Sequence, residues 1–141
     1  TGSLPVGQLI ELCFSGKHSK EELLDIITQN GGMKAYLGTK DAKLIEQSVL
    51  DGDDEATLIY NAIAYQVAKE IGALATVLEG EVDGILITGG LAYSDYIIRE
   101  ITRRVQFIAD VKVYPGEREM EGLYDNAALV LSGKAEIKEY V

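Results

Sequence analysis

The sequence predicts a helix-rich α/β domain, and three observations support this fold class. Apolar residues recur every three or four positions over most of the chain, which is the spacing of amphipathic helices. Two short apolar runs, 85–87 and 111–114, are typical of β-strands. One helical pattern separates these runs and another follows them, so the second half forms a β-α-β-α unit with parallel strands.

Length and composition indicate one globular domain. The chain has 141 residues, of which 47% are hydrophobic and 26% charged, and these values are ordinary for a domain of this size. We therefore expect residues 1–141 to form a single domain. Two strands are too few for a sheet, so we expect further strands either near residues 35–37 or upstream of Thr1.

Charge and cysteine content exclude several classes of function. The chain carries 23 acidic and 13 basic residues and a net charge of −10, which disfavours nucleic acid and anionic membranes as partners. No signal peptide or membrane-spanning run is visible. The single cysteine, Cys13, excludes an internal disulfide and favours the cytoplasm. The start at Thr1, without methionine, fits a processed chain or a piece of a longer one.

Two short helices are predicted first. Pro5 suits the start of a helix over residues 6–14, on whose apolar side we place Cys13. Ser19 and Glu22 have the spacing of a capping box and begin the next helix. The residues expected on its buried face are Leu23, Leu24, Ile26 and Ile27. His18, the only histidine, lies in a polar turn and is expected to be exposed.

A connector and the longest helix follow. Residues 31–41 are interpreted as an irregular connector, in which Thr39 or Asp41 caps a helix to about Leu50. The acidic residues at 51–55 complement the dipole of a helix over 53–79, because the spacing of a calcium loop is missing. The expected buried stripe consists of Ile59, Ile63, Val67, Ile71, Leu74 and Leu78, widened by Ala62, Ala64, Ala68, Ala73 and Ala75. Whether this face packs in the core or at a subunit interface stays open.

The most informative stretch is residues 82–94. Its strand ends in Gly89-Gly90, and Ser94 then begins a helix. Unpaired N–H groups and a helix dipole would both point at this turn, as in many phosphate sites. A tight turn without a ligand gives the same local pattern, so these residues alone leave both interpretations open.

The remaining elements complete the β-α-β-α unit. The helix after Ser94 is expected to bury Ile97, Ile98, Ile101 and Val105 and to expose Arg99, Arg103 and Arg104. Pro115-Gly116 ends the second strand. Glu117, Glu119 and Glu121 then lead a last helix to Gly133.

Four stretches resemble one family, the butyrate kinases of the acetate and sugar kinase/Hsp70/actin superfamily. They are LPVGQL (4–9), AYLGTKDA (35–42), ITGGLAYS (87–94) and VYPGE (113–117). Their order and spacing match the C-terminal part of those enzymes. The resemblance implies a ribonuclease H-like, actin/Hsp70-type nucleotide-binding domain, the C-terminal portion of a two-domain acyl kinase.

The resemblance also implies a reaction and its partners. ATP and butanoate would give butanoyl phosphate and ADP, with Mg²⁺, in a homo-oligomer. The acyl pocket and the groups that act on the transferred phosphoryl would lie in the missing N-terminal domain or otherwise upstream. We therefore expect no catalytic residue in this chain, and no activity from it alone.

Residues of the site follow from the same resemblance. Gly89, Gly90 and Leu91 would face the adenosine and the α-phosphate, with Ser94 nearby. The segment lining adenine and ribose would comprise Thr39, Asp41, Ala42 and Lys43. Related enzymes often have arginine in place of Lys43, and lysine cannot stack as a planar group. Glu119 or Glu121 would hold Mg²⁺ through water.

Two alternatives remain. The chain could belong to a kinase for another short or branched-chain carboxylic acid, because the acid pocket lies largely outside it. It could instead be an assembly domain without catalysis, for which the alanine-rich face of residues 53–79 would serve.

Overall fold

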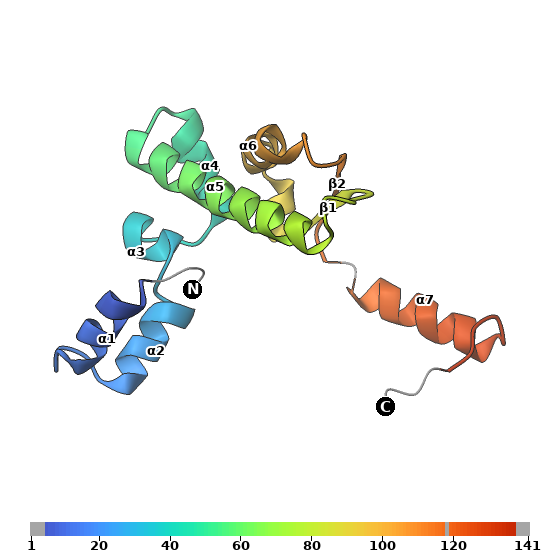
Figure 1. The fold of residues 1–141 in the computed structure, drawn as a ribbon, viewed down its shortest axis with the longest axis horizontal. Coiled ribbons are helices and arrows are strands. Elements are labelled where there is room, and N and C mark those ends of the chain that lie inside the picture. The colour runs from blue at the N-terminus through green and yellow to red at the C-terminus, as the bar shows by residue number, and fades with distance from the viewer. Residues whose placement is uncertain (1–4, 118, 138–141) are drawn as a thin grey trace. The chain divides into compact units, whose positions relative to one another are not determined.

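The computed structural model describes residues 5–117 and 119–137. Its chain divides into two compact units, residues 1–70 and residues 71–141, and each is described by itself. The elements of the first unit are α1 (Val6–Phe14), α2 (Lys20–Thr28), α3 (Met33–Leu37), α4 (Ala42–Leu50) and most of α5 (Asp54–Val77) (Figure 1). Those after α5 are β1 (Ile85–Gly89), the 3₁₀ helix η1 (Gly90–Tyr93), α6 (Asp95–Val105), β2 (Val111–Pro115) and α7 (Glu119–Leu131).

The core of the first unit lies on α4 and α5. Its buried side chains are Ile45, Val49, Ala56, Tyr60, Ala64 and Ala68. Tyr60 is fully buried, and its hydroxyl donates a hydrogen bond to the carbonyl oxygen of Ala42 at 3.3 Å. The four buried positions of α5 are spaced four residues apart, so the Tyr60 ring lies on the same helix face as small alanine side chains before and after it.

The buried stripe of α5 differs from the predicted one. Ala64 and Ala68 are buried as expected, but Val67 is exposed and Ile59 and Ile63 are only half-buried. The buried line runs instead through Ala56 and Tyr60. The prediction placed the isoleucines in the buried stripe because they are the more hydrophobic residues. Alanines are buried instead, because their small side chains allow the neighbouring backbone to approach more closely.

The N-terminal helices form as predicted, but their apolar faces do not become buried. The capping box of α2 is confirmed: the Ser19 hydroxyl accepts from the Glu22 amide, and the Glu22 carboxylate accepts from the Ser19 amide. Cys13 is exposed, which corrects the prediction of a core residue. The predicted buried face of α2 is also exposed at Leu24, Ile26 and Ile27. His18 is half-buried, whereas the sequence predicted it to be exposed. A helix buries its apolar face only where another element covers it.

Residues 33–37 are helical, which corrects the interpretation of 31–41 as irregular. Gly32 (φ 59°) precedes this helix and Gly38 (φ 70°) ends it, so both positions use backbone conformations that favour glycine. This result also excludes the additional strand considered near residues 35–37.

The second unit contains the parallel β-α-β arrangement that was predicted. β1 and β2 pair in parallel, with Ile85 opposite Val111 and Gly89 opposite Pro115. Within the described residues these two strands make up the whole sheet. α6 connects them and buries Ile97, Ile101 and Val105, three of its four predicted core residues. Ile98, the fourth, is half-buried.

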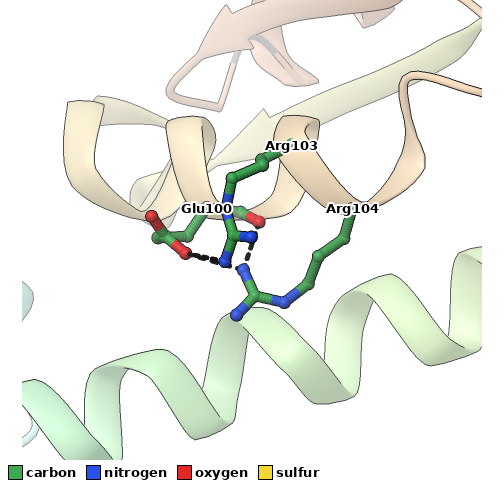
Figure 2. A network of polar contacts seen from close by, with 3 residues as sticks. All are labelled: Glu100, Arg103 and Arg104. Atoms are coloured by element: carbon green, nitrogen blue, oxygen red, sulfur yellow. Dashed lines mark hydrogen bonds and ion pairs between the residues drawn. The ribbon is translucent and has the colours of Figure 1, made fainter.

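A charged network lies on α6, in which Glu100 and Arg104 are half-buried and Arg103 is exposed, so the prediction of an exposed Arg104 is wrong. The Glu100 carboxylate accepts from the Arg103 guanidinium at 2.9 Å and from that of Arg104 at 2.7 Å. Arg104 also donates to the Glu100 carbonyl oxygen at 2.7 Å. Figure 2 shows the three side chains on the helix ribbon, with both guanidinium groups turned toward the acid. The hydrogen bonds from Arg104 and then Arg103 lower the pKa of Glu100.

No helix among residues 5–117 and 119–137 is long and apolar enough to cross a membrane.

Candidate nucleotide-binding site

The diglycine turn lies directly at the carboxyl end of β1. Gly89 has φ 85° and ψ −174°, a conformation that is essentially restricted to glycine. Gly90 starts η1, and a Cβ built on it would find no atom within 4 Å. The outer side of this turn is therefore open, and only Gly89 is needed for the turn itself.

Ser94 shapes the helix that follows the turn. Its side chain is buried, and its hydroxyl oxygen accepts from the Ile97 amide at 3.1 Å, as an N-cap does. Ser94 therefore fixes the direction in which α6 starts, and its hydroxyl oxygen accepts the capping hydrogen bond.

The two turns that follow β1 and β2 are joined to each other. The Gly89 amide donates to the Gly116 carbonyl oxygen at 3.2 Å, and the Gly116 amide donates back to the Gly89 carbonyl oxygen at 3.1 Å. The 3₁₀ helix η1 also packs against both strands. The diglycine turn and the Pro115-Gly116 turn thus form one local structure at the carboxyl end of the sheet.

A hollow of about 330 Å³ lies at this end. Its lining residues are Thr88, Tyr114, Gly116, Glu117 and Glu119. Thr88 and Tyr114 are opposite each other in the strand register, so their side chains leave the sheet on the same face. Ligands of open α/β sheets bind outside the carboxyl ends of the strands, so the hollow has the position expected for a ligand.

Acidic side chains on one side of the hollow could hold a divalent cation. Glu119 lines it, as does Glu117, whereas Glu121 does not appear in its lining. Residues 5–117 and 119–137 contain no group of three or more metal-ligating side chains. Mg²⁺ is commonly held by one or two carboxylates together with substrate phosphates. The acidic residues present therefore fit Mg²⁺ brought in with a nucleotide.

The second predicted segment lies in the first unit. Asp41 caps α4: one carboxylate oxygen accepts from the amides of Lys43 at 2.9 Å and Leu44 at 3.4 Å. The Thr39 hydroxyl oxygen accepts from the Asp41 amide at 3.1 Å. The carbonyl of Ala42 accepts from Tyr60. Asp41 and Lys43 are exposed, so both charged groups are accessible in this unit.

The predicted residues thus form two groups in different units. Thr39, Asp41, Ala42 and Lys43 share one loop and helix start in the first. In the second, Gly89, Gly90, Leu91 and Ser94 form the turn, and Glu119 lies at the hollow beside it.

Sequence reasoning missed several residues of this site. Thr88, Tyr114 and Glu117 line the hollow, and Tyr93 lies against the turn at Gly116. Thr88 and Tyr114 could have been found by pairing the residues directly before the two turns, since Thr88 precedes Gly89 and Tyr114 precedes Pro115. For Tyr93 the sequence carries no signal, because its contact depends on how the two turns meet.

Two solved structures share this fold. An acetate kinase from Porphyromonas gingivalis superposes with a TM-score of 0.77 at 20% identity, over 92% of this chain and 39% of that protein. A propionate kinase from Francisella tularensis subsp. tularensis SCHU S4 does so with a TM-score of 0.73 at 16% identity, over 85% of this chain and 37% of that protein. The chain therefore spans less than half the length of either kinase. Its fold class is that of the acetate and sugar kinase/Hsp70/actin superfamily.

The sequence also matches a family model, described as the acetokinase family, over residues 2–138. The chain belongs to the acetokinase family. The resemblance found in the sequence is thereby confirmed for the superfamily, while the narrower assignment to butyrate kinases stays a prediction.

Proposed function

We propose that this chain is the nucleotide-binding C-terminal portion of an acyl kinase that transfers a phosphoryl group between ATP and a short-chain carboxylate. One observation carries the proposal: the diglycine turn leads through η1 into α6 beside an acid-lined hollow at the carboxyl end of two parallel strands. Membership of the acetokinase family supports the same class of reaction.

Each group of residues has a role in this proposal. Gly89, Gly90 and Leu91 bring the backbone close to the adenosine and the α-phosphate, because no side chain stands over Gly90. The dipole at the start of α6 favours the phosphate charge. Thr39, Asp41, Ala42 and Lys43 form the proposed adenine and ribose side. Asp41 keeps one carboxylate oxygen for a ribose hydroxyl while the other caps α4.

Mg²⁺ is the proposed metal, and Glu119 is the residue proposed to hold it through water. When bound, the ion would neutralise phosphate charge during transfer. Glu119 is favoured over Glu121 because only Glu119 lines the hollow. Glu117 shares that position and adds a second carboxylate to the same side.

The acid substrate and the cellular setting are the finer parts of the proposal. We propose butanoate, on the four sequence stretches that resemble butyrate kinases; acetate, propionate or a branched acid is the alternative. The isolated chain is proposed to be catalytically silent, because it holds one wall of the nucleotide cleft. The whole enzyme is proposed to be a cytoplasmic homo-oligomer.

The test is a titration of Mg²⁺–ADP into the isotope-labelled chain, followed by amide NMR shifts. We expect shifts at residues 39–43 and 89–94, and we expect Gly90→Val to abolish them at 89–94. A Cβ at position 90 meets no protein atom within 4 Å, so the substitution is expected to exclude the ligand rather than disturb the turn. Gly7→Val is the matched control, because a Cβ at Gly7 also meets open space. Identical shifts in wild type and Gly90→Val would contradict the assignment of the turn.

A second candidate function is assembly without catalysis. Its supporting observation is that α1, α2, α3 and α7 contain no buried residue. Such helices fit a domain whose faces are covered by other protein. No amide shift at millimolar-range nucleotide, together with concentration-dependent self-association, would favour this candidate.

A further inference from the structure

Tyr93 makes a close contact that the proposed function does not use. Gly116 has φ 91°, and a Cβ built on it would lie 2.5 Å from the Tyr93 hydroxyl oxygen and 3.3 Å from Cζ. The end of the phenol ring therefore rests directly against the backbone at Gly116. The rest of the ring is free, since 65% of Tyr93 is exposed.

This contact joins two segments with different proposed tasks. Tyr93 ends η1, which begins at the diglycine turn, and both its sequence neighbours, Ala92 and Ser94, are buried and fixed. Gly116 immediately precedes Glu117 and lines the hollow together with Glu117 and Glu119. The tyrosine thus reaches from the proposed nucleotide turn to the segment that carries the carboxylates.

The position of Glu117 depends on that of Gly116, the residue that precedes it. A pair of backbone hydrogen bonds ties Gly116 to Gly89 in the first turn. α7, which begins at Glu119, has no buried residue among those described. A side chain packed against Gly116 therefore helps to fix where the carboxylate of Glu117 lies.

We propose that Tyr93 is a positioning residue that holds Gly116, and with it Glu117, beside the diglycine turn. It thereby couples the metal side of the site to the nucleotide side. This inference rests on the proposed nucleotide site, but the contact itself can be tested without a ligand.

The first measurement is hydrogen exchange of the Gly89 and Gly116 amides in the full 141-residue chain. We expect Tyr93→Ala to lower their protection roughly tenfold, because the ring no longer shields and restrains the paired turns. Tyr93→Phe should keep most of the protection, since the ring remains. Tyr65→Ala is the control, because Tyr65 is also an exposed tyrosine but lies on α5. Unchanged protection in Tyr93→Ala would overturn the inference, whatever the nucleotide does.

The second measurement is the ratio of the Kd for ADP without Mg²⁺ to the Kd with it. We expect Tyr93→Ala to lower this ratio at least about fivefold toward one, with a smaller change in the Kd for metal-free ADP. A merely structural role would weaken both affinities alike, and that result would overturn the inference.

Failure of the proposed function has a different signature. A wild-type chain that bound no nucleotide would overturn the nucleotide site and the coupling role together. Hydrogen exchange would still show whether Tyr93 holds the two turns in contact.

Discussion

Asp41 has a structural role in the fold and a proposed binding role at the same position. Its carboxylate caps α4 through the amides of Lys43 and Leu44. Asparagine caps helices about as well as aspartate, whereas alanine does not. We therefore expect Asp41→Ala to lower the free energy of unfolding by about 1 kcal/mol, and Asp41→Asn to leave it nearly unchanged.

Nucleotide binding should distinguish Asp41→Asn from wild type, although the stability of the fold does not. If the carboxylate accepts from a ribose hydroxyl, Asp41→Asn should weaken ADP binding about five- to tenfold although the fold is intact. Isothermal titration measures this effect beside a thermal unfolding curve. An Asp41→Asn chain that binds as well as wild type would limit Asp41 to its cap.

The two adjacent glycines of the turn differ in backbone conformation. Gly89 adopts a backbone conformation with positive φ, whereas Gly90 does not. Gly89→Ala should therefore lower the free energy of unfolding by about 1–3 kcal/mol. Gly90→Ala should lower it by only about a few tenths of a kcal/mol. Urea denaturation measures both losses, and the two variants control for each other because they introduce the same side chain at neighbouring positions. Equal losses would mean that the turn does not depend on the conformation of Gly89.

At the scale of an element, α6 should show a pH-dependent contribution from Glu100. The pKa of Glu100 is lowered in the folded chain by Arg104 and Arg103. Its stabilising effect is present above the pKa of the unfolded chain and is lost as pH falls through the lower folded value. We expect Glu100→Gln to cost about 1 kcal/mol at pH 7 and less at pH 3.

Urea denaturation at the two pH values measures this difference. The control is Glu70→Gln, an exposed carboxylate on α5 with no ion pair within the described part of the chain. A cost that is the same at pH 7 and pH 3 would show that the network does not depend on the charge of Glu100.

Local signals predicted most elements, and packing explains the exceptions. Ser19, Asp41 and Ser94 all cap the helices that follow them, because an N-cap depends on neighbours only a few residues away. The parallel pair followed from the order strand, helix, strand. The buried face of α5 was misplaced because burial of Tyr60 depends on its partner Ala42, eighteen residues earlier. Periodicity contains no information on such a partner.

The candidate site likewise contains one part that the sequence predicts and another that depends on how the strands pack. The turn at Gly89–Gly90 could be found from the sequence, because a strand, two glycines and a helix cap are adjacent there. The hollow could not, since Thr88 and Glu117 come together only through the strand pairing. The proposed preference for Glu119 over Glu121 likewise rests on the structure, because Glu119 lines the hollow and Glu121 does not.

At the scale of the whole molecule, many large apolar side chains are exposed among the described residues. Among the large exposed side chains are Phe14, Leu58, Leu74, Phe107 and Leu131. Together with a net charge of −10, this surface should make self-association increase with salt, because salt screens repulsion between like charges.

We expect sedimentation velocity to show a larger share of oligomer at about 0.5 M salt than at about 0.05 M. Leu74→Glu, at an exposed position of α5, should reduce that share if this face is an interface. Gln66→Glu adds the same charge at an exposed polar position of the same helix and is the control. An equal effect of both would indicate general charge repulsion, and no effect of either would place any interface elsewhere.

The hydrogen-bond pair between Gly89 and Gly116 has a consequence for changes in chain length. The strands run parallel, yet their ends turn toward each other and close a small ring of two bonds. An insertion of one residue inside either strand would break this ring and also turn the side chains of that strand to the opposite face. Insertions and deletions should therefore be tolerated only outside β1, β2 and the Gly89–Gly116 pair. Inside these elements, the distance along the chain from each strand to its glycine is fixed.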